Sequence, residues 1–308
     1  MRHHLITLSL LLAPLSAMAA PKNIIYMIGD GMGPSYLSAY RYYSDNKDTP
    51  QVENTVFDEL WQGMATTYPD DDTYVTDSAA SATALATGFK SYNGAIAVNR
   101  QHIPLDTMMQ IAKRLGKANG IVASSQVNHA TPASFLAHNK SRRNYDAIAD
   151  MYLDYRIDGK PVADVMIGGG TKYFVREDRN LVNEFKQLGY QYTDDYTQLD
   201  SITTAPAMML LAETALPAKL NSGFDAMLAP LTEKALQLLT PAKKGFVLMV
   251  EGSQIDWCGH DNDIACAMAE MDDFAKAIAV AKAYVDKHPD TLLVITADHE
   301  TGGMSLGA

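Results

Sequence analysis

The chain alternates short, continuous apolar runs with longer stretches of helical periodicity. The apolar runs are rich in Val, Ile and Leu, and each has the length of a strand. They lie at residues 23–30, 120–125, 164–170, 245–252 and 291–300. Because their apolar residues are continuous rather than alternating with polar ones, they are typical of strands buried on both faces of a parallel sheet.

Helical patterns occupy much of the sequence between these runs. They lie at residues 55–61, 78–87, 104–115, 143–153, 178–188, 231–239 and 264–286. This alternation predicts an α/β fold with a mostly parallel central sheet and helices on both of its faces. Residues 171–244 have the weakest pattern, and we interpret them as α/β decoration on the same domain.

The N-terminal residues have a different composition from the rest. Arg2 precedes an apolar stretch at residues 5–15, and small residues follow at 17–20, which fits a secretory signal peptide. The stretch is too short to span a bilayer well, and no other run approaches about 18 apolar residues. We therefore expect a signal peptide at residues 1–19, a single domain over residues 20–308, no membrane anchor, and a periplasmic or secreted location.

The 308 residues include 36 acidic and 25 basic side chains, which gives a formal net charge of −11. This balance argues against a nucleic-acid partner, and any phosphate or sulfate chemistry would need local positive charge, most simply from metal ions. Cys258 and Cys266 are the only cysteines. In an exported protein a disulfide between them is the leading interpretation, and two reduced thiols are the alternative.

Acidic residues stand at the carboxyl ends of three predicted strands. These are Asp30, Glu251 and Asp298, and His299 follows the last of them. Open α/β sheets bind ligands beyond the carboxyl ends of their strands. Three carboxylates converging there would repel one another unless they were protonated or bridged by cations. The sequence therefore predicts divalent metal ions at this edge of the sheet.

Two further segments offer metal ligands. If residues 253–260 form a helix, Asp256 and His260 share one face at i and i+4, although an exposed ion pair or a helix cap is the alternative. Asp298 and His299 could bind one ion where the chain turns after the strand, whereas a histidine in this position is otherwise a hydrogen-bonded surface group.

The glycines around Asp30 do not form a dinucleotide-binding loop. Their spacing is GxGxG followed by Pro34, and not GxGxxG. We expect them to let the backbone approach a metal bound by Asp30.

Ser78 opens a helix made almost entirely of Ala, Ser and Thr. No His or Lys is adjacent to act as its base, but a metal ion can replace that base, and the helix N-terminus offers donors to a bound oxyanion. The alternative is that Asp77 and Ser78 serve only as a helix cap. Arg142 and Arg143 could clamp a phosphoryl group, or could simply be solvated at the start of a helix.

Five motifs in this order resemble alkaline phosphatases from Asn23 to the end of the chain: "IGDGMG", "VTDSAASATALATG", "HATPASFLAHNKSR", "VEGSQIDWCGH" and "TADH". The resemblance implies a periplasmic or secreted phosphomonoesterase with two zinc ions and one magnesium ion, acting on small phosphate monoesters. It also implies that Ser78 is the nucleophile that forms a phosphoseryl intermediate, with Asp77 beside it. Arg142 would be the phosphate clamp, with Arg143 the less favoured choice.

The same resemblance implies the metal ligands. One zinc ion would be held by Asp30, Asp298 and His299, and the other by Asp256 and His260. The magnesium ion would be held by Asp30, Thr131 and Glu251. Two positions vary within the family, namely His129, where Asp also occurs, and Trp257.

One expected ligand is not found in the sequence. In the family a further histidine, well downstream of the "TADH" motif, completes the water-binding zinc site, but no histidine follows His299 here. Catalytic zinc usually has three protein ligands. Either the chain is incomplete at its C-terminus, or the third ligand comes from elsewhere, or this zinc site is defective, and we favour an incomplete chain. Homodimers are common in the family.

Two alternatives to a phosphomonoesterase remain open. One is a non-catalytic exported protein that binds metal or phosphate. The other is a related phosphodiesterase or sulfatase, although sulfatases usually carry a Cys/Ser-x-Pro-x-Arg pattern, and Ser78 is followed by Ala-Ala-Ser.

Overall fold

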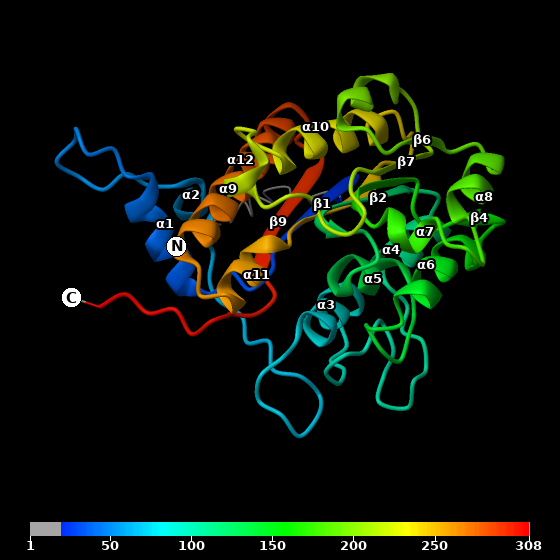
Figure 1. The fold of residues 1–308 in the computed structure, drawn as a ribbon, viewed down its shortest axis with the longest axis horizontal. Coiled ribbons are helices and arrows are strands. Elements are labelled where there is room, and N and C mark those ends of the chain that lie inside the picture. Colours follow the sequence, from blue (N-terminus) through cyan, green and yellow to red (C-terminus); the bar gives the residue numbers. More distant parts are fainter. Residues whose placement is uncertain (1–19, 308) are drawn as a thin grey trace, which may run out of the picture.

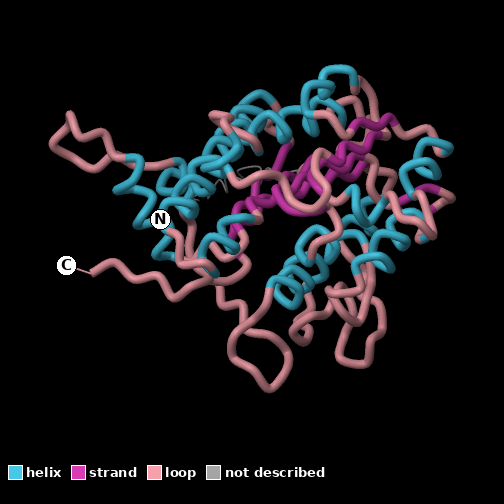
Figure 2. Tube along the Cα trace, in the orientation of Figure 1, coloured by secondary structure: helices cyan, strands magenta, loops and turns pink. Residues whose placement is uncertain are grey.

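The computed structural model describes residues 20–307, so the predicted signal peptide lies outside the described residues. Within residues 20–307, seven parallel strands form one central sheet in the order β6-β7-β5-β2-β8-β1-β9, seen as the magenta band in Figure 2. The strands are β1 (Asn23–Gly29), β2 (Ala118–Gln126), β5 (Val165–Gly169), β6 (Gln191–Thr193), β7 (Ala207–Leu210), β8 (Phe246–Gly252) and β9 (Thr291–Ala297). A small hairpin, β3 (Arg156–Ile157) and β4 (Lys160–Pro161), stands apart from the sheet.

Helices cover both faces of this sheet (Figure 1). One layer contains α1 (Pro34–Ser44), α2 (Val56–Leu60), α10 (Leu228–Leu239) and α12 (Ile264–Lys287). The other contains α3 (Ser78–Thr87), α4 (Met108–Arg114), α5 (Ala130–Leu136), α6 (Tyr145–Asp154) and α8 (Leu181–Gln187). Short elements complete the fold: α7 (Thr171–Phe174), the 3-10 turn Tyr196–Ser201, α9 (Lys219–Ser222) and α11 (Gln254–His260).

Each face of the sheet has its own hydrophobic core. In β8, Leu248 and Val250 join the core beneath α10 and α12, whereas Val247 and Met249 join the core beneath α4 and α5. This alternation follows from the two-residue period of a strand. The predicted α/β class, with a parallel sheet between two helical layers, is therefore confirmed.

The predicted elements differ from the structure at several positions. Residues 171–244 are not decoration, because they contain β6 and β7, which form one end of the central sheet. The helices α1 and α5 were not predicted. The helix predicted to start at Pro104 starts at Met108, because Thr107 forms a capping box with Gln110 and so fixes the first turn.

The register of the sheet brings the predicted acidic residues together. Ile28 of β1 aligns with Glu251 of β8 and with Thr296 of β9. Asp30 and Asp298 each follow two residues after these aligned positions, so all three carboxylates leave the sheet at the same edge. The strand predicted over residues 291–300 ends at Ala297, just before Asp298.

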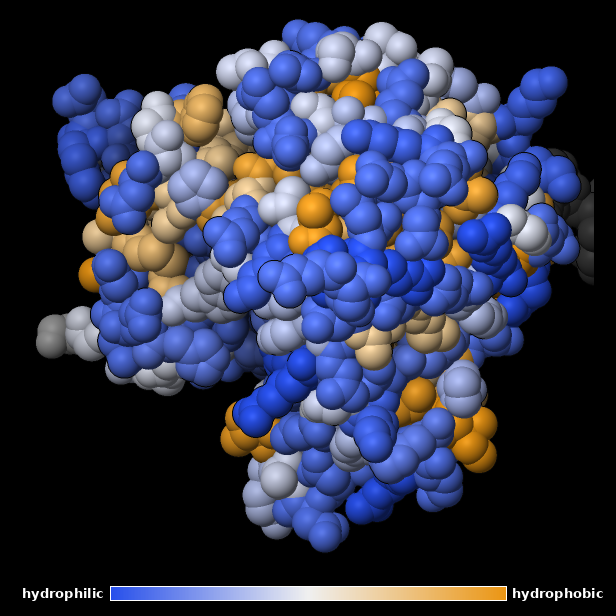
Figure 3. Space-filling model, turned by 45° about the vertical axis from the view of Figure 1, so that its right-hand side comes forward, coloured by the Kyte–Doolittle hydropathy of each residue, from blue (hydrophilic) through white to orange (hydrophobic). Residues whose placement is uncertain are grey.

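The surface is mainly hydrophilic on the face shown in Figure 3, with separate groups of hydrophobic residues. No helix within residues 20–307 is long and apolar enough to cross a membrane. Cys258 of α11 and Cys266 of α12 form a disulfide, as the leading interpretation expected. This bond joins α11 to the long helix that covers the sheet.

Two buried acidic residues of α12 hold the segment that leads into α10. Glu270 accepts a hydrogen bond from the backbone N–H of Lys219 at 2.6 Å, and Asp273 accepts from the N–H groups of Met227 and Leu228 at 2.7 and 3.0 Å. Burial raises the pKa of Glu270 to about 7. Between about pH 4.5 and pH 7, Glu270 therefore keeps its proton in the folded protein, whereas it has lost that proton in the unfolded chain.

The free energy of unfolding of the original chain should fall as the pH rises from about 4.5 to about 7. We expect Glu270→Gln to abolish this decrease. The amide keeps an acceptor for Lys219 but never ionises, so the variant becomes more stable than the original at pH 8, by at most about 3 kcal/mol. Near pH 4.5 the two should be close. Urea unfolding at both pH values measures this, with the exposed Glu233→Gln as the control. A stability difference that is the same at both pH values would contradict the prediction.

Candidate active site

The candidate site lies where three strand ends meet the N-terminus of α3. Asp30 follows β1, Glu251 lies near the end of β8, and Asp298 follows β9. All three side chains are completely buried. These three residues therefore converge at one edge of the sheet, as predicted.

Ser78 is the first residue of α3 and is buried at this meeting point. Its Oγ lies 3.2 Å from Asp30 Oδ1 and 3.1 Å from His299 Nε2. Asp77, the residue before Ser78, is the helix cap, because its carboxylate accepts a hydrogen bond from Ala80 N at 2.9 Å. Since Asp77 caps the helix, the hydroxyl of Ser78 is left to face the strand ends.

The small side chains of α3 allow the helix to pack closely against α5. Ala79, Ala82 and Ala86 are all buried, and α3 packs against α5. The Thr83 hydroxyl donates a hydrogen bond to Ala95 O at 2.9 Å, and this bond connects α3 to the loop that follows it. Larger residues would hold the helix axis farther away and would move Ser78 from the site.

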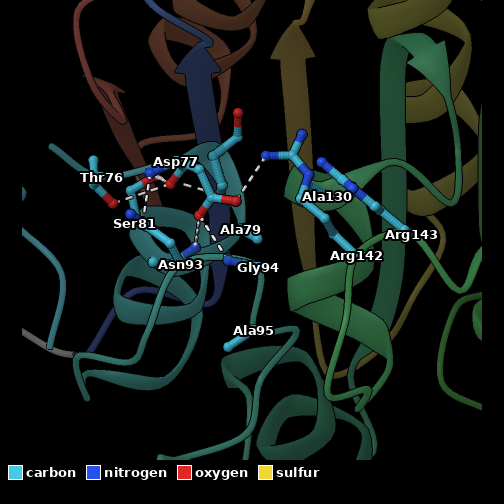
Figure 4. A network of polar contacts seen from close by, with 12 residues as sticks. Thr76, Asp77, Ala79, Ser81, Asn93, Gly94, Ala95, Ala130, Arg142 and Arg143 are labelled. Carbon is cyan, nitrogen blue, oxygen red and sulfur yellow. Dashed lines mark hydrogen bonds and ion pairs between the residues drawn. The ribbon is translucent and has the colours of Figure 1, made fainter. Parts of the chain in front are cut away.

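Asp77 also holds Arg142 (Figure 4). Arg142 Nη1 donates to Asp77 Oδ2 at 3.0 Å, while Gly94 N donates to Asp77 Oδ1 at 3.1 Å. Asn93 accepts from Asp77 N at 2.8 Å. Arg143 is exposed and makes no ion pair with any part of the described chain. The structure therefore places Arg142, and not Arg143, in contact with the start of α3.

One group of possible metal ligands lies beside Ser78. Asp30, Asp256 and His299 each offer a ligand atom within 4.8 Å of the others. His260 lies at the edge of this group, with Nε2 3.5 Å from Asp256 Oδ1, and its side chain is mostly exposed. The predicted i, i+4 pair on α11 is therefore present.

Asp298 lies behind this group and is held by donors. It accepts from Gly31 N at 3.0 Å and from Ser81 Oγ at 3.2 Å, and its Oδ2 lies 3.5 Å from His299 Nε2. Gly31 has a φ of +70°, and a side chain there would come within 2.9 Å of the Cα of Asp256. This position requires glycine because of the approach of Asp256, whereas the expected approach to a metal ion stays a prediction.

A second group lies deeper in the protein. Asp30, His129 and Glu251 offer ligand atoms within 4.8 Å of one another, and Thr131 is buried nearby on α5. Within residues 20–307, four buried ligand atoms here have no hydrogen-bond partner: Asp30 Oδ2, Glu251 Oε1, Thr131 Oγ1 and His129 Nδ1. Buried polar atoms are rarely left without a partner, so this donor set fits a bound cation.

The pKa values of the site residues also indicate that positive charge would stabilise the site. Burial, and then the charge of Asp298, raises the pKa of Asp30, and burial raises the pKa of Glu251 to about 7. Burial disfavours a proton on His299, but the carboxylates of Asp298 and Asp30 outweigh it and raise its pKa to about 10. Burial and the charge of Arg142 lower the pKa of His129 to about 3, so this imidazole is neutral and able to bind a metal.

Sequence reasoning missed several contacts of the site. Ser81, Asn93 and Gly94 support Asp298 or Asp77, and Thr301 donates a hydrogen bond to Asp256. Ser81 lies one helical turn after Ser78, and this spacing is a signal that could have been used. Nothing in the sequence around Asn93 and Gly94 points to Asp77.

Comparison with known proteins identifies close relatives. The family model described as alkaline phosphatase matches residues 21–308. Alkaline phosphatase 3 of Bacillus subtilis (strain 168) is 51% identical over 289 residues, which are 93% of this chain and 63% of that protein. The chain thus spans less than two thirds of the length of this curated relative.

Two solved structures are similar along nearly the whole chain. A cold-active alkaline phosphatase from the psychrophile Shewanella sp. has a TM-score of 0.87 at 57% identity, covering 93% of this chain and 70% of that one. A histidine-to-glutamate mutant of TAB5 alkaline phosphatase, with Mg bound in its M3 site, has a TM-score of 0.84 at 34% identity. That match covers 94% of this chain and 81% of the other.

We expect Mg2+ to stabilise the protein through the group that contains Glu251. At a concentration about 100-fold above its Kd, the ion should add about 2.7 kcal/mol to the free energy of unfolding, and a chelator should reverse the effect. Glu251→Gln should remove most of this gain, because it neutralises one of the ligands. The measurement is the Tm with and without Mg2+.

Glu270→Gln is the matched control, since Glu270 is also a buried glutamate with a raised pKa but lies outside the site. Its response to Mg2+ should equal that of the original chain. If Glu251→Gln responds as strongly as Glu270→Gln, Glu251 does not take part in binding the ion.

Proposed function

The chain belongs to the alkaline phosphatase family, and from that premise we propose that it hydrolyses small phosphate monoesters at the site around Ser78. The observation that carries this proposal is the position of the Ser78 hydroxyl. It stands at a helix N-terminus, between Asp30 and His299, in a site whose buried carboxylates would be stabilised by bound cations.

In the proposed first step, Ser78 Oγ attacks the phosphorus of the ester and releases its hydroxyl proton. The bond between phosphorus and the ester oxygen breaks, and the alcohol leaves after taking up a proton. In the second step, water attacks the phosphoserine, the bond from phosphorus to Ser78 Oγ breaks, and inorganic phosphate leaves. The serine hydroxyl is then restored.

The residues around Ser78 prepare it for this attack. Asp30 Oδ1 lies within hydrogen-bond distance of the hydroxyl and orients it. The first turn of α3 presents backbone N–H groups to the phosphoryl oxygens, and the helix dipole favours their negative charge. Arg142, held in place by Asp77, can bind two of these oxygens through its planar guanidinium.

We propose that two zinc ions and one magnesium ion complete the site. Asp30, Asp298 and His299 would hold one zinc, and Asp256 and His260 would contribute to the other. When bound, such ions lower the pKa of the attacking hydroxyl and stabilise charge on the attacking and leaving oxygens.

The magnesium ion would lie among Asp30, Thr131 and Glu251, next to His129. The partnerless buried oxygens of these residues support this assignment, because Mg2+ prefers oxygen ligands. The magnesium bound by a mutant of TAB5 alkaline phosphatase also supports a magnesium site in this fold.

We further propose that the protein is exported to the periplasm or secreted, and that it forms a homodimer. The disulfide between Cys258 and Cys266 supports export, because such bonds persist in oxidising compartments.

Ser78→Ala should lower turnover of an aryl phosphate, assayed with Zn2+ and Mg2+, by at least about 1000-fold, because it removes the nucleophile. Intact mass spectrometry after an acid quench should find phosphate on the original chain and none on the variant. The exposed helical serine in Ser44→Ala should leave both readings unchanged. A protein that binds Zn2+ but shows no turnover and no phosphoserine would instead be a non-catalytic binding protein.

Arg142→Ala should lower kcat/KM about 10-fold to 100-fold, because a charged hydrogen bond to phosphate is worth about 1.5–3 kcal/mol. Competitive inhibition by inorganic phosphate should weaken in the same variant. The adjacent Arg143→Ala is the matched control and should change kcat/KM less than about 3-fold. Equal effects of the two substitutions would mean that the guanidinium of Arg142 has no special role.

A further inference from the structure

Thr301 lies outside the motifs of the site but contacts two of its residues. Its side chain is buried in the turn after β9. Thr301 Oγ1 donates a hydrogen bond to Asp256 Oδ1 and lies 3.1 Å from His299 Nδ1. One hydroxyl therefore joins a residue of α11 to a residue of the turn that follows the edge strand.

The chemistry of a hydroxyl suits both contacts at once. A threonine hydroxyl has one proton to donate and lone pairs to accept. Because the proton goes to Asp256, the oxygen accepts from His299, which places a hydrogen on Nδ1. The carbonyl oxygen of Glu300, 3.1 Å from the same Nδ1, requires the same arrangement. Nε2 then faces Ser78 and Asp30, where a bound metal ion would take the place of its proton.

Thr301 is itself held from α1. Tyr36 Oη donates to Thr301 O at 2.7 Å, and the ring of Tyr36 is buried. Burial, followed by the charges of Glu300 and Asp256, raises the pKa of Tyr36 to about 12, so the phenol remains a donor under alkaline conditions. This hydrogen bond fixes the backbone of the turn to α1, near the N-terminal end of the described chain.

Two glycines make room for this arrangement. A Cβ at Gly259 would lie 2.2 Å from Tyr36 Oη and 3.2 Å from Thr301 Cβ. Gly302 has a φ of +85°, and a Cβ there would lie 2.5 Å from Gly259 O. Side chains at these positions would separate α11 from the turn, so the close contact of Thr301 with Asp256 depends on both glycines.

We propose that Thr301 is a positioning residue that sets the zinc affinity of the site by fixing Asp256 and the Nδ1–H form of His299, with Tyr36 holding Thr301 in place. This inference rests on the proposed function, because it assigns both residues to zinc. Removing such a supporting hydrogen bond typically costs about 10-fold to 100-fold in metal affinity.

The test compares Thr301→Val, which keeps the shape but loses the hydroxyl, with Thr301→Ser, which keeps the hydroxyl. Zn2+ affinity is measured by competition with a chromogenic chelator, and the Tm of the metal-free proteins checks folding. Thr301→Val should bind Zn2+ at least about 10-fold more weakly, and Thr301→Ser should stay within about 3-fold of the original chain. Thr296→Val is the matched control, since the Thr296 hydroxyl donates only to Ala297 O within the described chain and its loss should leave affinity unchanged.

A second comparison tests the role of Tyr36. Tyr36→Phe should weaken Zn2+ binding about 3-fold to 10-fold, and adding it to Thr301→Val should weaken binding no further. If the two losses multiply instead, Tyr36 does not act through Thr301.

The outcomes separate this inference from the proposed function. Zn2+ affinity that is unchanged in Thr301→Val, or equally weakened in Thr301→Ser, overturns the positioning role while leaving the phosphatase proposal intact. An original chain that binds no Zn2+ overturns both.

Discussion

Buried negative charge at one edge of the sheet is the constraint on which the site depends. Parallel strands in register end at the same edge, so the acidic residues after β1 and β9 and near the end of β8 have to meet there. Asp30, Glu251 and Asp298 are all removed from solvent. A buried carboxylate is tolerated only with a proton, a donor or a cation, and the surroundings of these three groups supply donors for only some of their oxygens.

The division between satisfied and unsatisfied atoms indicates how the site works. Both oxygens of Asp298 accept hydrogen bonds, and these contacts fix the group. Asp30 and Glu251 each keep one oxygen without a partner among the described residues, and both residues belong to the deeper ligand group. Hydrogen bonds from the protein thus orient the carboxylates, and in the deeper group the atoms without a partner remain available for a cation, as expected of a preorganised metal site.

The sequence predicted the parts of the fold that follow from strong, local patterns. The five continuous apolar runs became neighbouring strands, and the helix predicted over residues 78–87 has those bounds. The acidic residues of the site could be found because parallel topology alone determines where strand ends lie. By contrast, β6 and β7 have only three and four residues, which is too short for a hydrophobic period to show.

The supporting contacts of the site could not be predicted for a different reason. Asn93 and Thr301 act through hydrogen bonds to residues elsewhere in the sequence or across a turn, and such bonds leave no periodic signal. The contact of Asp77 with Arg142 could not be predicted for a related reason, since the same residue both caps α3 and binds Arg142. Only the three-dimensional arrangement shows that these two roles are compatible, because they use different oxygens of one carboxylate.

One continuous set of contacts links the deeper ligand group to the nucleophile. His129 Nε2 lies 3.4 Å from Arg142, which binds Asp77, which in turn caps the helix that begins with Ser78. Because His129 is neutral, it does not compete with Asp77 for the guanidinium; a carboxylate at this position would attract Arg142 and weaken its hold on the cap. A substitution at His129 would therefore affect both metal binding in the deeper ligand group and the position of Arg142, so these two properties are coupled in this site.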